Sequence, residues 1–164
     1  MSVEGLSRLK VWMRAKDFAL LVYKKVLPSL PSEEKWNLSQ QLRRASLSIS
    51  ANIAEGYGRF YYQENVRFCY MARGSLEEVL SHLTFAHEMR FVSDELYKEL
   101  ASEGDAIDKM LNGYISFLKK ANRAPVSPEP TMWLMKKRVR TRLSPPRRPM
   151  ATKLFSNHLF SNLS

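Results

Sequence analysis

The chain has 164 residues, 45% of them hydrophobic, enough for one globular domain with a core of its own. Its net charge of +10 is uneven, because residues 1–123 carry 18 Lys and Arg against 15 Asp and Glu, whereas residues 124–164 carry eight against one. The basic character therefore belongs mainly to the C-terminal tail, and the overall charge does not by itself predict nucleic-acid binding by the folded part.

The cysteine content and the N-terminal residues indicate the compartment. Cys69 is the single cysteine, which excludes an intrachain disulfide and fits a reducing environment. The first ten residues lack the apolar core of a signal peptide, and the apolar run at 18–22 is far shorter than the ~20 residues of a spanning helix. We therefore expect a cytoplasmic protein without a membrane span.

Residues 9–27 predict the first helix, since apolar residues recur on one helical face. Pro28 and Pro31 should end it, because proline cannot donate a backbone hydrogen bond. The expected inward-facing residues are Val11, Ala15, Phe18, Val22 and Val26.

The second helix has two starting signals. Ser32 is followed by two acids that favour a helix N-terminus, and Asn37 precedes Gln40 with the spacing of a capping box. A short turn followed by the main helix would satisfy both. The Gly-Tyr-Gly sequence at 56–58 should end this helix, whose apolar face is Leu38, Leu42, Ala45, Ile49 and Ile53.

Two longer periodic segments follow. The third helix should run from about Gln63 to Met89, and Gly74 within it is typical of a close approach by another backbone. Ser93 opens the fourth helix with an N-cap pattern. The inward faces are Val66, Cys69, Leu76, Leu80, Leu83 and Ala86 in the third helix, and Leu96, Leu100, Ile107, Leu111, Tyr114 and Leu118 in the fourth.

Four amphipathic helices with short connections and no strand-like alternation predict an all-α fold. The simplest arrangement, over residues 1–123, is an antiparallel up-down four-helix bundle. Residues 124–164 hold six of the eight prolines and no glycine, and we expect them to form a disordered basic tail.

The second helix also carries a polar stripe and, beyond it, a weakly apolar surface. At about 100° per residue, the stripe from Gln41 to Glu55 occupies a sector of roughly 80° beside the core face. A helix exposed on a monomer would usually carry Lys and Glu where the weakly apolar surface lies. We therefore favour contact with a neighbouring subunit over simple tolerance of small residues, through Leu47, Ala51 and Ala54.

Charges in a part-buried stripe need partners. We expect a structural polar network of Arg44, Asn52, Glu55, Arg73 and Glu78. Within it, Arg73 is assigned to Glu55 and Arg44 to Glu78, although the sequence does not set the register of the helices.

Three segments carry a family resemblance. VW at 11–12, SQQLRRASLSISANIAEGYGR at 39–59 and RFCYMARGSLEE at 67–78 resemble the bacterial four-helix-bundle proteins associated with 23S ribosomal RNA intervening sequences, over about residues 9–120. The resemblance implies an antiparallel four-helix bundle that assembles as a homopentamer. The chain is also similar to the accessory proteins of diversity-generating retroelements, basic pentamers that work with a reverse transcriptase and nucleic acid.

Two positions depart from the family pattern. Ser50 stands where the family commonly has proline, so a kink in the second helix is less expected here. The segment FYYQEN at 60–65 lacks the small polar cap usual before the third helix. The resemblance ends before the tail, and no family property is transferred to residues 124–164.

Basic and aromatic residues near the second and third helices are candidate nucleic-acid contacts. Arg43, Arg59 and Arg67 suit phosphates, and the rings at 57 and 60–62 suit stacking on bases. The alternative is that the arginines pair with carboxylates while the rings pack the corner between the two helices. The sequence leaves both interpretations open.

The tail contains a stronger electrostatic signal, KKRVRTR at 136–142. A basic arm of this kind binds nucleic acid with a strong salt dependence, and the candidate residues are Lys136, Lys137, Arg138 and Arg140. A solvated extension without function and a contact with an anionic membrane surface are the alternatives.

Catalytic, metal and cofactor sites are not predicted. His82 and His87 lie on different helix faces, no zinc-ligand spacing occurs, and no nucleophile and base can be paired. We therefore expect a non-enzymatic homo-oligomer, without cofactor or small-molecule substrate, that binds structured RNA or DNA or a nucleic-acid-associated protein. An oligomeric protein scaffold without nucleic-acid contact is the alternative.

Overall fold

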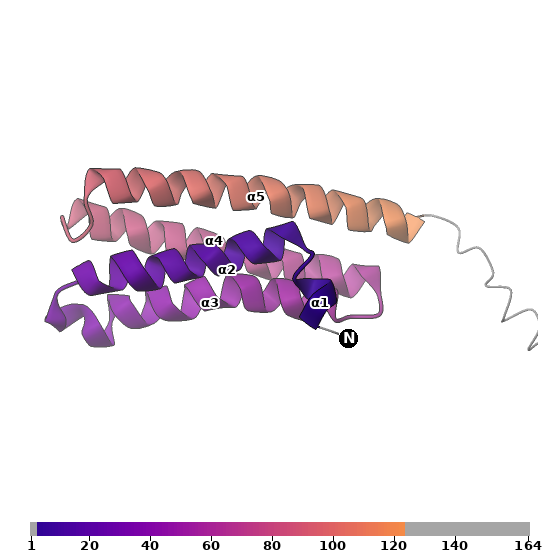
Figure 1. Cartoon of the computed structure of the whole chain (residues 1–164), viewed down its shortest axis with the longest axis horizontal. Coiled ribbons are helices and arrows are strands. Elements are labelled where there is room, and N and C mark those ends of the chain that lie inside the picture. Colours follow the sequence, from indigo (N-terminus) through magenta and orange to yellow (C-terminus); the bar gives the residue numbers. More distant parts are fainter. Residues whose placement is uncertain (1–2, 124–164) are drawn as a thin grey trace, which may run out of the picture. The chain divides into compact units, whose positions relative to one another are not determined.

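The computed structural model describes residues 3–123, and the regular elements in this range are all helical (Figure 1). The α-helices are α1 Val3–Leu6, α2 Lys10–Leu21, α3 Leu38–Tyr57, α4 Tyr62–Glu88 and α5 Asp94–Arg123. The prediction of an all-α fold is therefore confirmed for this range. The predicted disorder of residues 124–164 lies outside the described residues.

The first predicted helix changes its winding before it ends. The α-helical part, α2, ends at Leu21, and the chain continues as a π-helical turn, Val22–Val26, and a 3-10 turn, Leu27–Ser29. The wider turn accommodates one extra residue per turn, so the regular spacing used for prediction does not hold to residue 27. The five predicted inward residues are nevertheless all buried.

Both starting signals of the second helix are used, but the capping box is not. A 3-10 turn, Ser32–Trp36, leads into α3, and the Asn37 side chain does not cap it. The Glu34 carboxylate instead accepts hydrogen bonds from the Leu38 backbone N–H and from Asn37 Nδ2, each at 3.2 Å. From there α3 is a continuous α-helix, which includes Ser50.

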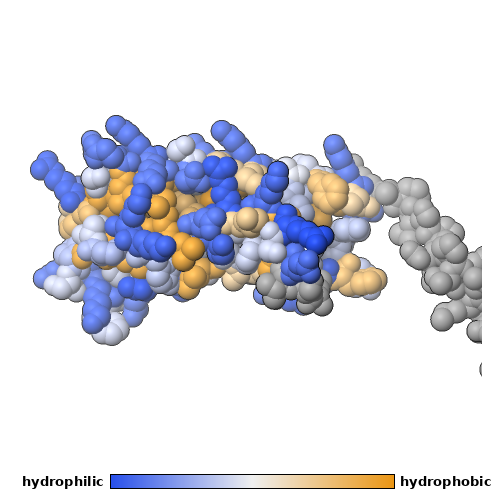
Figure 2. Space-filling model, in the orientation of Figure 1, coloured by the Kyte–Doolittle hydropathy of each residue, from blue (hydrophilic) through white to orange (hydrophobic). Residues whose placement is uncertain are grey.

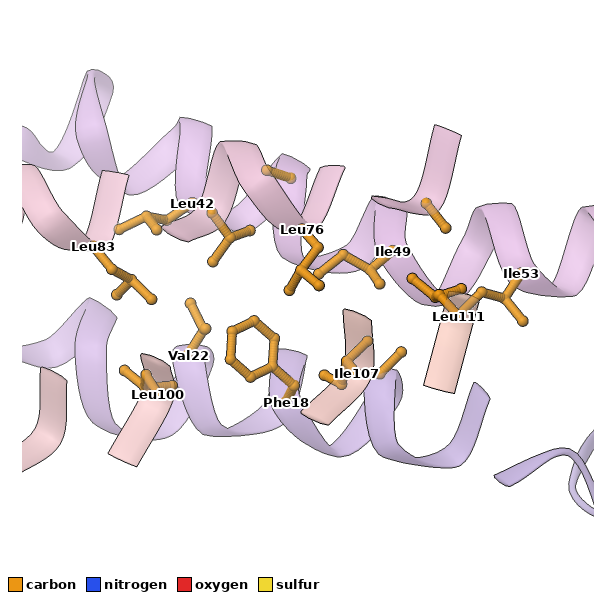
Figure 3. Packing of buried hydrophobic residues seen from close by; sticks show 14 of the residues in the cluster. Phe18, Val22, Leu42, Ile49, Ile53, Leu76, Leu83, Leu100, Ile107 and Leu111 are labelled. Carbon is orange, nitrogen blue, oxygen red and sulfur yellow. The ribbon is translucent and has the colours of Figure 1, made fainter. Parts of the chain in front are cut away.

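A single apolar core joins α2, α3, α4 and α5, and Figure 3 shows side chains of these helices pointing toward one another. All five predicted inward residues of α3 are buried. Val66, Leu80, Leu96 and Tyr114, predicted inward on α4 and α5, are only partly buried and pack on the edge of the core. The core faces of α4 and α5 are therefore broader than predicted, and also include Ala72, Val79 and Ile115.

The long helices contact one another in a ring of pairs: α2 with α3, α3 with α4, α4 with α5, and α5 with α2. Two ion pairs close the ring between α2 and α5. Arg14 donates two hydrogen bonds of 2.9 Å to Glu103, and the Lys25 Nζ lies 2.9 Å from a Glu99 carboxylate oxygen. The Arg14 guanidinium also lowers the pKa of Glu103 through its hydrogen bond.

The close approach expected at Gly74 occurs at another glycine. A Cβ at Gly74 would meet no atom of the described chain within 4 Å, whereas a Cβ at Gly56 would lie 2.8 Å from both Phe68 Cβ and Asn65 Oδ1. Gly56 therefore allows α3 to pack closely on the beginning of α4. Gly58 follows the end of α3 with a φ of −72°, so the helix ends there without a left-handed residue.

None of the helices in residues 3–123 combines the length and the apolar character that crossing a membrane requires.

Candidate nucleic-acid interface

One end of the helical unit presents three consecutive aromatic rings. Phe60, Tyr61 and Tyr62, here called the aromatic corner, join α3 to α4 and have exposed fractions of 89%, 65% and 47%. The rings of Phe60 and Tyr61 stand at 90° to each other with centroids 5.1 Å apart. No side chain caps α4 at Tyr61, in agreement with the departure from the family pattern at this position.

A buried polar cluster holds the aromatic corner on the core. Asn65, one turn into α4, is buried and donates from Nδ2 to the Tyr114 hydroxyl of α5 at 3.1 Å. Its Oδ1 accepts a 3.5 Å hydrogen bond from the Cys69 thiol. Burial raises the pKa of Tyr114 and raises the pKa of Cys69 to about 11. The cluster thus fixes the start of α4 against α5 with satisfied hydrogen bonds.

The arginines predicted near this corner have different surroundings. Arg59 forms an ion pair with Glu55, and its guanidinium lies 4.9 Å from the centroid of the Phe68 ring. Arg67 is exposed on the surface of α4. The guanidinium of Arg59 is thus committed to contacts within the chain, whereas Arg67 is accessible to a ligand.

A groove lies beside the corner, between the first turns of α4 and the last turns of α5. Its volume is about 340 Å³, at the small end of the ~300–1,000 Å³ range of ligand pockets. The lining residues are Tyr62, Gln63, Val66, Leu118, Lys119 and Asn122. Lys119 Nζ also donates to the Tyr70 hydroxyl at 2.8 Å, which positions its positive charge at the edge of the groove.

The two ends of the helical unit differ in charge. The end formed by residues 4–10, 55–70 and 112–122, here called the basic end, holds six Lys and Arg against three Glu. The segments at 24–38 and 82–99, at the opposite end in Figure 1, hold five Lys and Arg against six Asp and Glu. Residues 124–164, with eight Lys and Arg, continue from α5 at the basic end.

The structure brings together only part of the predicted polar network. Arg44 of α3 forms an ion pair with Glu78 of α4, as predicted. The pairing of Arg73 with Glu55 is wrong, because Arg73 donates to Asn112 Oδ1 of α5 at 3.1 Å and Glu55 pairs within α3 as described above. Residue 73 faces α5 rather than α3, a consequence of the rotation of α4 about its axis.

Two further predicted residues of α3 lie on opposite sides of the helix. Asn52 is partly buried on the side toward α4, in line with the polar stripe. Arg43 is exposed, and its guanidinium lies 5.2 Å from the centroid of the Tyr23 ring. Arg43 is therefore separated from the aromatic corner, near which Arg59 and Arg67 lie.

The surface predicted to contact another subunit is open in the isolated chain. Leu47 is 52% exposed, Ala51 is exposed and Ala54 is partly buried. The remaining candidates, Lys136, Lys137, Arg138 and Arg140, lie outside the described residues.

The sequence analysis missed the buried polar cluster and the groove. A signal for the cluster was present, because Asn65 lies four residues before Cys69 and eleven before Leu76, in phase with the core face of α4. A polar residue in that phase predicts a buried, hydrogen-bonded amide. The groove had no such signal, since its two walls come from helices whose relative register depends on packing.

The comparisons with known proteins agree on one family. A family model described as 23S rRNA-intervening sequence protein matches residues 7–113. The fold is similar to the crystal structure of a protein of unknown function from the S23 ribosomal protein family of Bacteroides thetaiotaomicron VPI-5482, with a TM-score of 0.59 and 23% sequence identity. That match covers 64% of this chain and 97% of the other. A comparison with curated proteins gave no match.

Proposed function

Because the chain belongs to the family of 23S rRNA-intervening sequence proteins, we propose that it is a non-enzymatic, homo-oligomeric helical protein of the cytoplasm that binds structured RNA or DNA. The family is named after an RNA insertion, which makes a nucleic-acid ligand the natural first hypothesis. The binding surface in this proposal is the basic end, together with the basic segment of the tail.

The observation that carries the proposal is the location of charge and aromatic surface at the same end. Phosphates attract Lys and Arg, and exposed rings provide contacts to bases. Within the described residues, no carboxylate lies within ion-pair distance of Arg67, Lys119 or Lys120. Their charges are therefore available to a polyanion, and the candidate tail residues would add to them.

Self-association is part of the proposal. The solvent-exposed surface of α3 around Ala51 carries an exposed leucine and small residues rather than a Lys- and Glu-rich face, which supports a helix from another subunit as its partner. A homopentamer is the assembly that the family resemblance implies. For the subunit itself we propose an antiparallel up-down bundle, supported by the short connections and the ring of helix pairs.

A role without catalysis is supported by the state of the most nucleophilic side chain. Cys69 is fully buried, and burial raises the pKa of its thiol to about 11, so that very little thiolate forms near neutral pH. The two helical histidines have acidic neighbours, His82 with Glu78 at 3.8 Å and His87 with Asp94 at 2.7 Å. Neither pair lies beside a nucleophile in the described residues.

An oligomeric protein scaffold is the second candidate. Figure 2 shows hydrophobic side chains between the hydrophilic ones on the face where α2 runs beside α5. Met13 and Leu20 of α2 and Phe117 of α5 are exposed apolar residues, and exposed apolar surface favours a protein partner. This surface lies on other helices than the basic residues of α4.

A filter-binding titration of the full chain against fragments of 23S rRNA separates the two candidates. We expect binding at about 50 mM salt that weakens steeply toward about 200 mM, because each neutralised phosphate releases counterions. A matched fragment of double-stranded DNA tests whether RNA is preferred. Absence of binding to either nucleic acid at low salt would remove the nucleic-acid function and leave the scaffold.

A further inference from the structure

The aromatic corner has a property that phosphate binding does not explain. Phe60 has no polar group for water to solvate, yet 89% of its surface is exposed, and the adjacent Tyr61 is 65% exposed. Such rings are usually buried or at a binding surface. The two rings lie in the short connection between α3 and α4, whose ends are held by the contact at Gly56 and by the buried polar cluster, so the position of the rings is set by the fold.

The charges around these rings select the kind of partner. Arg67 and Lys119 flank the corner and its groove, and Lys120 lies one residue further along α5. Glu64 is the acid of the basic end that the structure leaves without an ion-pair partner among the described residues. An excess of cations beside exposed rings complements a polyanion with flat aromatic groups, which is the chemistry of a nucleic acid.

The groove extends this surface and offers base-sized recognition. Tyr62 belongs both to the aromatic corner and to the wall of the groove. Val66 and Leu118 supply apolar walls, and the amides of Gln63 and Asn122 supply hydrogen-bond donors and acceptors. A planar, hydrogen-bonding group that leaves a ring of the corner can therefore enter a site with suitable walls.

We propose, on the basis of the function above, that the aromatic corner binds an unpaired segment of RNA, by stacking bases on Phe60 and Tyr61 while Arg67 and Lys119 contact the flanking phosphates. In a duplex the base faces are covered by their neighbours, so protruding rings cannot stack on them. In loops, bulges and ends the bases are splayed out and their faces are free. Exposed rings thus distinguish unpaired from paired segments.

The test measures fluorescence anisotropy with the full chain and two labelled RNAs of equal length, an oligouridine and a fully paired hairpin stem. The double variant F60A/Y61A should weaken binding to the oligouridine about tenfold or more, because each lost stacking contact typically costs that order of affinity. Binding to the paired RNA should change little. The control is Trp36→Ala, which removes an equally exposed ring (74%) at the opposite end and should leave both affinities unchanged.

The charged residues give a separate readout. Arg67→Ala and Lys119→Ala should weaken binding to both RNAs, and each should reduce the slope of log affinity against log salt by about one. F60A/Y61A should leave that slope unchanged. Equal losses for both RNAs in F60A/Y61A, or no loss for the oligouridine, would contradict base stacking.

Failure of this inference is distinguishable from failure of the proposed function. If the unmodified chain binds the paired RNA but not the oligouridine, the proposed function stands and the inference is wrong. If neither RNA binds at low salt, the nucleic-acid function fails and the inference fails with it. If light scattering shows that F60A/Y61A changes the number of subunits, the rings belong to a subunit contact and the inference is overturned.

Discussion

Asn65 illustrates how a single polar residue in phase with a core face becomes a structural anchor. Its amide uses both ends, donating to Tyr114 and accepting from Cys69. A buried amide that lost these partners would cost about 1–3 kcal/mol. Because the cluster lies directly beneath the aromatic corner, it connects the stability of the core to the geometry of the candidate interface.

The buried thiol of this cluster should be unreactive in the folded protein. With a pKa of about 11, roughly a thousandth of Cys69 is ionised at about pH 8, whereas an unfolded cysteine is substantially ionised there. We expect alkylation by iodoacetamide to be slower by at least about two orders of magnitude in native protein than in denaturant. Equal rates in the two states would show that the thiol is accessible.

The same pKa shift predicts a loss of stability in alkaline solution. The unfolded thiol ionises near pH 8.5 and the folded thiol near 11, so unfolding is increasingly favoured as the pH rises between these values. Below about pH 8 the contribution is fully present. The denaturation midpoint of the native chain should therefore fall more between about pH 8 and about pH 10 than that of Cys69→Ala, which lacks the group. Parallel midpoints would contradict the shift.

At the scale of helices, the crossing of α3 and α4 depends on a missing side chain. Gly56→Ala would place a Cβ 2.8 Å from Phe68 Cβ, an atom that moves only with its backbone. Overpacking of this kind costs about 1–3 kcal/mol. We therefore expect Gly56→Ala to lower the free energy of unfolding, measured by chemical denaturation at a constant protein concentration.

Gly113→Ala is the matched control, because Gly113 also lies within a helix but its Cβ would meet nothing within 4 Å. Alanine is preferred over glycine in helices by about 1 kcal/mol, so this variant should be more stable than the native chain. The two substitutions thus have opposite expected signs. An increase in stability for Gly56→Ala would show that the two helices are not in close contact at this position.

For the whole molecule, the proposed assembly depends on the small residues on the outer surface of α3. Ala51→Glu and Ala54→Glu should each reduce the number of subunits measured by light scattering, since a charge placed in an apolar contact loses its hydration. Helix content measured by circular dichroism should remain unchanged. Ser102→Glu, at an exposed position of α5, serves as a control and should leave the assembly intact. An unchanged assembly in both alanine variants would contradict the proposed contact.

The sequence by itself determined the helices and most of the core, because both depend on spacing within one segment of chain. Regular recurrence of apolar residues predicted the buried faces, and Ser93 predicted the start of α5, where its Oγ accepts from the Leu96 N–H at 3.3 Å. Only the tertiary structure decided that Arg73 meets Asn112 rather than Glu55, and that the close glycine is Gly56. These contacts depend on the rotation and register of one helix against another, which packing of the assembled core sets and spacing along a single helix does not contain. The groove between α4 and α5 arises for the same reason.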